Sequence, residues 1–580
     1  MEPIVGIDLG TTNSEVAFIV DGHSTVLVDG DNGIVPSVVG IDDNGRILVG
    51  REALNQAVLA PERTVRSVKR RMGTTDRIPM GENAYLPQEI SACILKALKS
   101  RAEKYLNRPV SKAVITVPAY FTDAQRQATR EAGEIAGLEV VRIINEPTAA
   151  SLAYESQNPE TRTILVYDLG GGTFDVSIVR IEKGIVEVLS STGDNHLGGD
   201  DFDNRIKELL INHIQDGYGI DVSSNPIAVA RLKRAAEAAK IALSENPFAQ
   251  IEEDHIGERK GRPIHLSYEL SRMSFVEMIQ DYLDRTMDCV TRALKDALML
   301  PSAIDKIILV GGSTRIPQIS ELLLKKFGKL PHSEIDPDLC VALGAAIQAG
   351  REMGLDSTSV LLDVTPYTFG TSAMGELDGR TSPFCYVPLI RRNTKLPTHR
   401  ADVFWTLEDN QKAVDVMVYQ GEEPYALDNV LLGKFFFPLT PAPKGSEIVL
   451  HFDLDINGIL KVQAIEKHTG KKIEGVIENA IGRFNEQEIS ALRQRVDTLW
   501  KDEALAEVEN AGPETTTDEM PFDIRDLLDK AAQKLNEAPE EDRDEMINLM
   551  EDIRDAIREG QMENARDLAK DLEDILYYIE

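Results

Sequence analysis

The chain has 580 residues, of which 42% are hydrophobic and 27% charged, and its formal net charge at pH 7 is −33. This length exceeds what one hydrophobic core supports, so several domains are expected. The acidic charge disfavours nucleic acid and membrane surfaces as partners. No apolar run approaches the roughly 20 residues of a membrane-spanning helix, and the N-terminus lacks the pattern of an export signal.

Four cysteines stand far apart in the sequence, at Cys93, Cys289, Cys340 and Cys385. They form no C-x-x-C pair, which argues against a disulfide framework and against a zinc site. Thiols stay reduced in the cytosol, so this usage predicts a cytoplasmic location.

Strand and helix patterns alternate through residues 1–353, which predicts an α/β domain. The apolar run 164–167 is typical of a strand, whereas 123–136 and 229–244 have helical periodicity. Thr122 and Gln125 have the spacing of a capping box at the start of the first helix. The next segment, 354–363, begins as a polar linker and ends in the apolar triplet 360–362. That triplet either starts the following strand or docks the linker against the preceding domain.

Residues 364–482 have the two-residue period of β-strands, so we expect an all-β domain. Apolar and polar side chains alternate over 414–419, and apolar residues recur at every second position over 450–456. Asn457-Gly458 follows the second run, and this dipeptide is typical of a two-residue hairpin turn.

Beyond residue 483 the apolar period becomes helical and indicates a small bundle. The two apolar stripes comprise Met546, Met550, Ile553 and Ile557, and Leu568, Leu572, Ile575 and Ile579. A segment with two prolines, 512–521, is expected to interrupt any helix. Residues 483–580 carry 29 acidic and 12 basic side chains, which indicates a solvated helical surface.

The most informative feature is an internal repeat. Residues 4–12 and 165–173 each consist of an apolar strand, Asp-Leu-Gly and a tight turn that precedes another strand. Glycines let successive backbone N–H groups approach an oxyanion, and Asp8 and Asp168 are suited to the hydrated Mg²⁺ of a nucleotide. One such turn is commonly structural, but two facing turns would hold a phosphate chain from both sides. A third glycine turn, 311–315, suits adenosine binding or a plain strand-to-helix connection.

Six longer segments are more specific: residues 6–14, 115–121, 145–150, 167–175, 196–203 and 310–315. In sequence and order they resemble the heat-shock chaperones of the DnaK type (seventy-kilodalton heat-shock proteins). Actin and sugar kinases share the phosphate hairpins but not these segments. The resemblance implies a two-lobed α/β ATPase domain of the actin/hexokinase-like fold (1–353) and a linker (354–363). A β-sandwich that binds peptide (364–482) and an α-helical lid bundle (483–580) would follow.

By this resemblance the chain is an ATPase that binds ATP or ADP with Mg²⁺, and K⁺ is a further suggested cofactor. Lys69 is expected to position the attacking water, and Asp175 or Asp8 to accept its proton. The catalytic set is Asp8, Lys69, Glu146, Asp168, Thr173 and Asp175, with Asp8 and Asp168 holding the metal through water. The nucleotide-binding set is Gly10, Thr11, Thr12, Asn13, Gly170, Gly171, Gly172, Thr173, Glu237, Lys240, Ser244, Gly311, Gly312, Ser313, Arg315 and Asp338.

The resemblance also assigns residues outside the nucleotide site. Those expected to couple the domains are Pro118, Arg126, Arg142, Leu361, Leu362 and Asp363. Those expected to line a peptide groove are Phe369, Met374, Phe404, Leu407, Val414 and Val416. The implied partners are unfolded or extended polypeptides, a J-domain co-chaperone and a nucleotide exchange factor.

The chain departs from the family pattern near the groove, in the ATPase domain and in the lid, where 512–521 interrupts what is normally a long helix. Thr371 stands where an aliphatic residue is usual, and Leu407 where a small residue is common. Segment 375–389 is longer than expected, and 73–87 is shorter. These differences bear on client preference and leave the nucleotide site intact.

We therefore predict an ATP-dependent chaperone that binds and releases unfolded hydrophobic segments under the control of ATP hydrolysis. Three alternatives are a chaperone with one dedicated client, a small-molecule kinase of the actin/hexokinase superfamily, and a scaffold that binds ATP without turnover. Without the resemblance, Lys69 would be interpreted as a surface lysine and Glu146 as an acid at a helix N-terminus.

Overall fold

The computed structural model describes residues 2–29, 32–157, 161–182, 184–332, 336–355, 360–475 and 484–510, and individual residues between 527 and 576. The chain divides into two compact units, Met1–Trp500 and Lys501–Glu580. Within the described residues, no helix is both long and apolar enough to span a membrane.

The first sheet of the larger unit is built around β1 (Ile4–Leu9), all of whose residues are buried. β1 is parallel to β10 (Lys112–Val117) and antiparallel to β2 (Asn13–Val20). The flanking strands are β11 (Glu139–Asn145), β3 (His23–Val26) and β4 (Val35–Pro36). Asp8 lies near the carboxyl end of β1, and its side chain lines a pocket.

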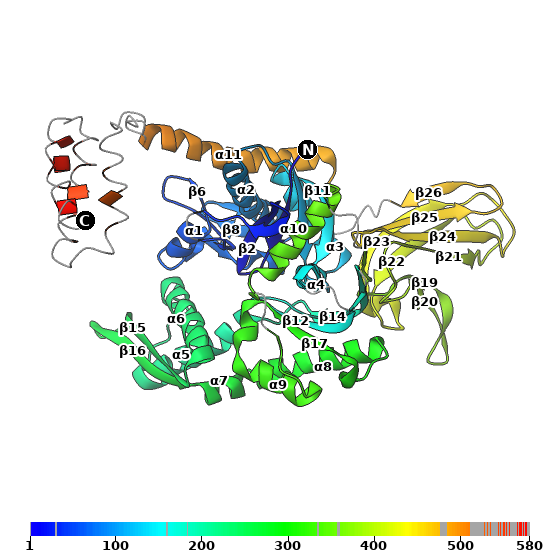
Figure 1. Cartoon of the computed structure of the whole chain (residues 1–580). Helices are drawn as coiled ribbons and strands as arrows, with labels where there is room; N and C mark the ends of the chain where they lie inside the picture. The colour runs from blue at the N-terminus through cyan, green and yellow to red at the C-terminus, as the bar shows by residue number, and fades with distance from the viewer. Residues whose placement is uncertain are drawn as a thin grey trace. The chain divides into compact units, whose positions relative to one another are not determined.

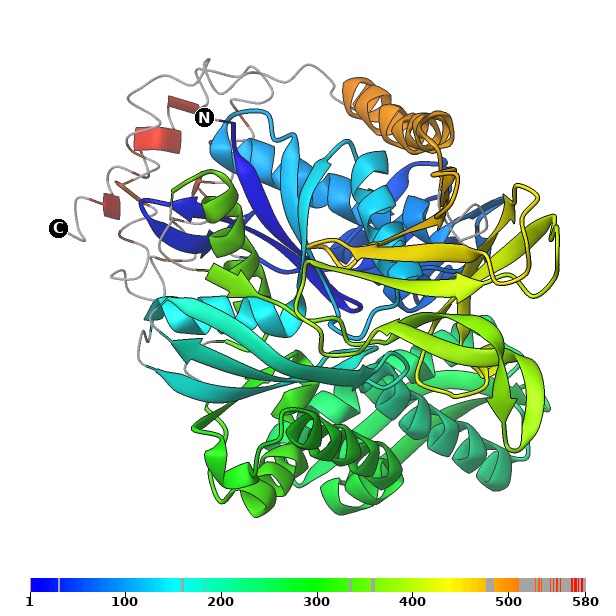
Figure 2. The same ribbon diagram turned by 90° about the vertical axis from the view of Figure 1, so that its right-hand side faces the viewer.

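The second sheet repeats this arrangement. Its strand β12 (Arg162–Leu169) is parallel to β17 (Lys306–Val310) and antiparallel to β13 (Phe174–Glu182). β14 (Ile185–Asp194) and β18 (Val360–Leu362) complete the sheet. The sequence repeat is therefore also a structural repeat, in which β1 and β12 each end in an Asp-Leu-Gly turn. In Figure 2 the blue strands of the first sheet lie in the upper half of the view, and most of the green helices, which come after β14 in the chain, lie in the lower half.

Helices pack against both sheets, so the predicted mixture of strand and helix is confirmed. The capping box of α3 is also confirmed, because Gln125 N donates to Thr122 Oγ1 while Gln125 Oε1 accepts from Thr122 N. The helices are α1 (Arg51–Gln56), α2 (Pro87–Leu106), α3 (Asp123–Ile135), α4 (Glu146–Gln157), α5 (Gly199–Tyr218), α6 (Pro226–Glu245), α7 (Arg272–Met278), α8 (Gln280–Asp296), α9 (Pro317–Phe327), α10 (Cys340–Glu352) and α11 (Glu486–Asn510).

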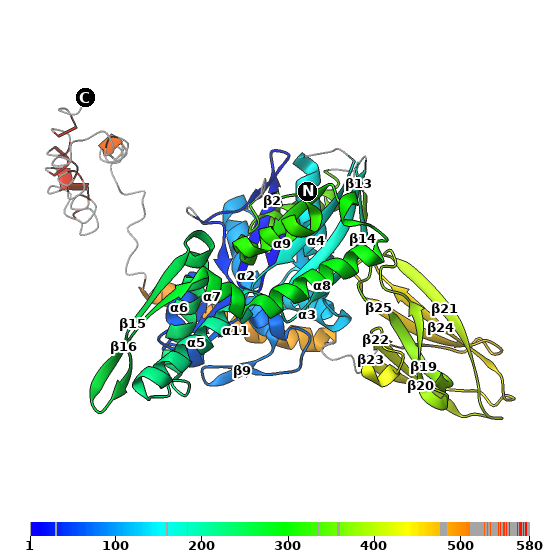
Figure 3. The same cartoon turned by 90° about the horizontal axis from the view of Figure 1, so that it is seen from below.

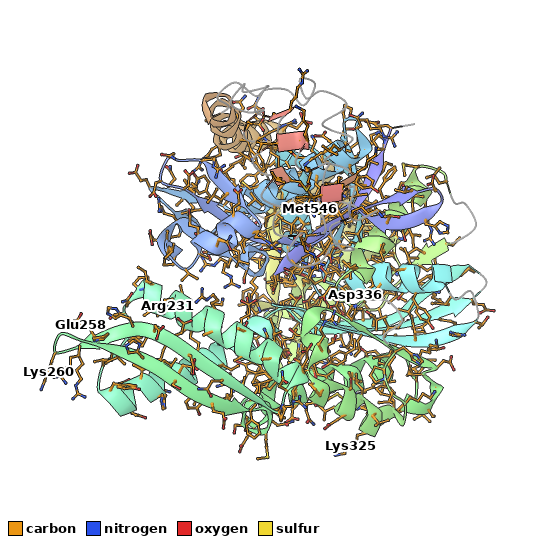
Figure 4. The ribbon with its side chains drawn as sticks, turned by 60° about the vertical axis from the view of Figure 1, so that its left-hand side comes forward. Arg231, Glu258, Lys260, Lys325, Asp336 and Met546 are labelled. Carbon is orange, nitrogen blue, oxygen red and sulfur yellow. The ribbon has the colours of Figure 1, made fainter. Side chains whose placement is uncertain are left out.

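Smaller sheets flank these layers. Their strands are β5 (Val38–Ile41), β6 (Ile47–Val49) and β7 (Thr64–Arg66), then β8 (Ile78–Met80) with β9 (Asn83–Tyr85), and β15 (Phe248–Arg259) with β16 (Arg262–Ser271). The β15–β16 hairpin projects beside α5 and α6 (Figure 3). Glu258 and Lys260 lie at its tip (Figure 4).

Residues 364–475, which we call the β-rich part, contain two four-stranded antiparallel sheets that share one apolar core (Figure 1). One sheet has the order β20 (Arg380–Ile390), β19 (Phe369–Leu377), β22 (Ala413–Gln420) and β23 (Val430–Pro438). The other has the order β21 (Thr398–Trp405), β24 (Glu447–Leu454), β25 (Leu460–Glu466) and β26 (Lys472–Gly475).

The hairpin predicted at Asn457-Gly458 is confirmed, but the predicted turn length of two residues is wrong. The ladder between β24 and β25 ends at the Leu454–Leu460 pair, so five residues form the connection. Asp455 Oδ1 accepts from the backbone N–H groups of Asn457 and Ile459, which stabilises this longer turn. Side-chain capping thus replaced the tight turn that the dipeptide alone favours.

The β-rich part packs against the N-terminal α/β elements. Leu460 N donates to Asp123 Oδ1 at 3.0 Å, and Asn457 Oδ1 accepts from Ile143 N at 2.9 Å. Arg392 pairs with Asp296 of α8 at 2.9 Å. These contacts join residues separated by up to 337 positions, so the larger unit has one continuous packed body.

Helix α11 lies along α2 (Figure 1). Val496 of α11 is fully buried in the core that contains the first sheet. Around it, Lys96 pairs with Asp497, and Arg495 reaches Glu89 at 3.1 Å. An apolar residue flanked by two ion pairs is a specific contact, and residues 486–500 of α11 belong to the larger unit.

The second unit has its own apolar cluster. Met546, Met550, Ile553 and Leu572 are buried in it, and Leu568 and Ile575 pack beside them. Both predicted stripes thus supply core residues. Their members Ile557 and Ile579, and the predicted interruption at 512–521, lie outside the described residues.

Glu131 of α3 lies at the start of α11 and is fully buried. Its Oε1 accepts from Phe484 N and from Gln127 Nε2, both at 3.1 Å. Burial raises the pKa of Glu131 to about 7 despite these donors. Gln88 donates to the second oxygen while its own Oε1 has no partner, so a turned Gln88 amide would accept the carboxyl proton.

Glu131→Gln should therefore change how stability depends on pH. The folded-state pKa lies above the unfolded value, so Glu131 contributes fully below pH ~4.5 and loses that contribution as pH rises through about 7. At pH 5 the variant should unfold like wild type, and at pH 8 its midpoint should be about 2 °C higher. Thermal unfolding across this pH range measures the difference, with Glu139→Gln, an exposed acid, as control. An equal midpoint difference at both pH values would contradict a buried neutral carboxyl group.

Candidate functional site

A pocket opens between the two Asp-Leu-Gly turns and holds about 550 Å³ of empty space, part of which is open to solvent. Predicted residues that line it are Asp8, Gly10, Thr11, Thr12, Asn13, Lys69, Glu146, Asp168, Gly170, Gly171, Thr173, Gly311, Gly312 and Asp338. Those that do not are Gly172, Asp175, Glu237, Lys240, Ser244, Ser313 and Arg315.

The two turns approach each other closely. A β-carbon at Gly171 would lie 1.9 Å from Thr12 Oγ1, so an added side chain would displace Thr12 of the facing turn. Gly311 adopts φ +80°, and a side chain there would strike the Leu169 carbonyl. Both glycines therefore serve close backbone approach, which is the property that phosphate binding needs.

Lys69 lines the pocket together with Asp8, Glu146 and Asp168, and Asp175 lies next to Asp168 without lining the pocket. Lys69, at the 3₁₀ helix Val68–Arg71, forms an ion pair with Glu146 at the start of α4. Asp8 Oδ1 accepts from Thr116 Oγ1 at 2.6 Å. Asp175 and Asp168 face each other in the β12–β13 ladder.

Burial dominates the electrostatics of this cluster. It raises the pKa of Glu146 to about 7 and that of Asp175 to about 6. Burial, reinforced by the neighbouring acids, raises the pKa of Asp168 well above its ordinary value, and burial also raises that of Asp8. Burial alone would lower the pKa of Lys69, but Glu146 and Asp8 outweigh it and raise that pKa. The lysine is therefore cationic and cannot neutralise all four acids.

The acids fit a hydrated cation better than a bare one. Asp168 Oδ2 is buried and has no hydrogen-bond partner, so a donor or a cation is expected beside it. Within the described part of the chain, no three His, Cys, Asp or Glu side chains converge closely enough to ligate a metal directly. Mg²⁺ retains several of its waters in such sites, and Asp8 and Asp168 would hold it through them.

The residues predicted to bind adenosine lie on both sides of the third glycine turn, 311–315. Ser313 Oγ donates to the Gly170 carbonyl at 3.0 Å, and Arg315 pairs with Asp338 at 2.7 Å. Glu237 of α6 pairs with Arg66 at 2.7 Å and lines an adjoining pocket that shares Thr11, Thr12 and Asn13 with the first.

Other members of α6 are held by their own neighbours. Lys240 pairs with Asp203 at 2.8 Å, and Ser244 Oγ donates to the Lys240 carbonyl. This face of α6 is therefore beside the pocket without lining it.

The predicted coupling residues meet near Asp363, whose charge also acts on the Arg142 guanidinium; Arg142 in addition approaches Glu352 at 3.8 Å. Asp363 Oδ2 accepts from Asn145 Nδ2 and Thr148 Oγ1. Asn145 in turn accepts from Arg126 at 2.7 Å. Leu361 and Leu362 pair with Val186 and Glu187 as β18 adds to β14, and Pro118 begins the loop beside Arg126.

The residues predicted to line the peptide groove fall into two groups, one in or against the core and one half exposed. Phe369 and Val416 lie in the core of the β-rich part, and Phe404 and Val414 pack against that core. Only Met374 and Leu407 are about half exposed. The alternation that marks a strand could not separate core positions from groove positions.

Sequence reasoning missed Glu15 among the residues that line the pocket. Glu15 pairs with Asp8 in the β1–β2 ladder, is 2% exposed, and its Oε1 has no partner. The available signal was one charged residue inside the apolar strand 14–20. Val310, Pro337 and Val341 also line the pocket and carry no such signal.

Known proteins resemble this chain over almost its whole length. A family model described as Hsp70 protein matches residues 4–79 and 75–580, and the chain belongs to the Hsp70 family. A chaperone protein DnaK of Thermosipho africanus is 42% identical over 581 residues, which cover 99% of this chain and 95% of that protein. A chaperone protein DnaK of Thermotoga neapolitana is 41% identical over 582 residues, or 99% and 96%. The resemblance to chaperones of the DnaK type is thus confirmed.

Gly171→Ala should weaken nucleotide binding at least about tenfold, because its β-carbon forces Thr12 and the two turns apart. Calorimetric titration with ADP and Mg²⁺ measures the loss. Gly217→Ala is the matched control, since a β-carbon there meets nothing within 4 Å. Wild-type affinity in Gly171→Ala would show that the close approach of the turns is unimportant.

Proposed function

We propose that this chain is an ATP-dependent molecular chaperone that hydrolyses ATP in the pocket between the two turns. The observation that carries the proposal is the meeting of Gly171 with Thr12 beside Lys69 and four buried acids. The two named relatives are chaperones and match this chain over 99% of its length. The function that they suggest therefore concerns the whole chain.

In the proposed reaction, backbone N–H groups of residues 11–13 and 171–173 bind the phosphates, because those of Gly10 and Gly170 already donate within their own turns. Bound Mg²⁺ would neutralise phosphate charge, and K⁺ would add to this. Lys69 orients the attacking water at the γ-phosphate, and Asp175 or Asp8 accepts its proton. Positioning and charge neutralisation supply most of the catalysis in phosphoryl transfer.

The proposed domain organisation follows the family. Residues 1–353 form the two-lobed actin/hexokinase-like ATPase domain and 354–363 the linker. Residues 364–482 form a β-sandwich for peptide, and 483–580 a helical lid. Because Met374 and Leu407 are exposed, they are the better candidates for contact with an unfolded client. A J-domain co-chaperone, a nucleotide exchange factor and a cytoplasmic location belong to the same proposal.

A small-molecule kinase is not favoured. Such an enzyme has no use for the β-rich part or for the second unit, whereas the chaperone relatives extend over both. A scaffold without turnover is opposed by the buried Lys69–Glu146 pair, because burying two charges costs stability and the lysine supplies a cation to the pocket.

Steady-state release of phosphate from ATP tests the proposal. Wild type should hydrolyse ATP, and an unstructured peptide with a leucine-rich centre and lysine-containing ends should accelerate it severalfold. Lys69→Ala should lower turnover at least about a hundredfold by removing the cation at the γ-phosphate, while ADP still binds. Lys104→Ala, an exposed lysine paired with Asp29, serves as control. Wild-type protein that releases no phosphate, or a Lys69→Ala variant as active as wild type, would refute the assignment.

A further inference from the structure

Two histidines lie side by side on the solvent face of the sheet that contains β21 and β24. β21 is the outer strand of this sheet, and the ladder pairs His399 with Asp453 and Ala401 with His451, so both imidazoles lie on one face. The rings lie 5.3 Å apart between centroids, with an interplanar angle of 35°. Nε2 of His399 lies 3.3 Å from Nδ1 of His451, so the two nitrogens face each other across the strands.

Asp453 determines which nitrogen of His399 is free. Its Oδ1 lies 2.5 Å from His399 Nδ1, and an ionised carboxylate can only accept a proton there. The neutral ring then carries its lone pair on Nε2, which is the nitrogen that faces His451. A carboxylate behind an imidazole is the arrangement that holds the tautomer and the orientation of a metal-ligating histidine.

The spacing of the two facing nitrogens suits one shared metal ion. Imidazole nitrogens bind Zn²⁺ at ~2.1 Å, so two of them on one tetrahedral ion lie about 3.4 Å apart. The 3.3 Å between His399 and His451 agrees with this value. The alternative use of the contact is a hydrogen bond from one ring to the other. A neutral His451 that carries its proton on Nε2 leaves both facing nitrogens to an ion.

We propose that His399 and His451 chelate one divalent ion of the class that prefers imidazole, namely Cu²⁺, Ni²⁺ or Zn²⁺, and that Asp453 is a positioning residue for His399. Among the described residues no third ligand joins the pair, so water fills the other positions. The bound ion ties the outer strand β21 to β24. None of the three residues lines the nucleotide pocket, so this inference stands apart from the proposed function.

Calorimetric titration of Ni²⁺ into the full chain tests the site, with excess Mg²⁺ present to occupy sites that consist of oxygen ligands. His399→Gln and His451→Gln should each weaken the binding of one Ni²⁺ at least about tenfold, because a single imidazole remains. Asp453→Ala keeps both ligands and should weaken the same ion about tenfold. The substituted side chains lie on the solvent face, so the unfolding midpoints without metal should equal that of wild type.

His468→Gln is the matched control, because it removes an exposed histidine of the same β-rich part. His468 lies beyond the Ile448–Glu466 pair, at the opposite end of the β24–β25 hairpin from Asp453. This variant should bind Ni²⁺ with wild-type affinity.

Two further measurements distinguish a shared ion from an ion on a single histidine. Electron paramagnetic resonance with one equivalent of Cu²⁺ should detect two imidazole nitrogens in wild type and not in His399→Gln. At a Ni²⁺ concentration ten times the dissociation constant, amide exchange that requires β21 to separate from β24 should slow about tenfold.

Equal Ni²⁺ binding by wild type and both histidine variants would overturn the site and leave a hydrogen bond between the rings. Loss of binding in only one of those variants would show an ion on a single histidine and would also overturn the pair. Wild-type affinity in Asp453→Ala would overturn the positioning role. Because ATP takes no part in these measurements, failure of the proposed ATPase activity would leave their outcome unchanged.

Discussion

The structure depends on placing one lysine among four buried carboxylates. Lys69 and Glu146 are each less than 10% exposed, and Asp8, Asp168 and Asp175 are buried as well. Full ionisation of this group would leave an excess of negative charge in a medium that screens it poorly, and burial accordingly raises the pKa of all four acids. A cation with its bound phosphates is the natural complement. The ends of β1 and β12, the 3₁₀ helix at Lys69 and the start of α4 all converge to form this charge arrangement.

The same elements reach the β-rich part by short routes. α4 carries both Glu146, which pairs with Lys69, and Thr148, which donates to Asp363. Strand β18 extends the second sheet immediately before Asp363. The loop after β10 contacts Asp175 on one side and Tyr367 on the other. The same helix and the same loop therefore contact both the charged residues of the pocket and the β-rich part.

Two kinds of feature could be predicted from the sequence: those set by a local pattern and those set by the internal repeat. The repeat placed Asp8 and Asp168 at matching strand ends, and the capping box of α3 appeared as expected. The family resemblance, which is confirmed, added Lys69 and Glu146, whose adjacency no local pattern indicates. Their ion pair joins positions 77 residues apart.

What the sequence could not predict depends on tertiary packing. Phe369 and Met374 lie on the same strand, yet one is core and the other half exposed. The Asn457-Gly458 turn lengthened because Asp455 caps it and Asn457 reaches Ile143 on β11. Glu15 is a pocket residue only because β2 pairs with β1 in one register. Each outcome follows from a neighbour that is remote in the chain.

The most direct test of the central claim is a calorimetric titration of ADP into the full chain with Mg²⁺ and again with the metal chelated. If the acid cluster is completed by a cation, ADP should bind tightly with Mg²⁺ and at least about a hundredfold more weakly without it. Absence of ADP binding in the presence of Mg²⁺ would contradict the account.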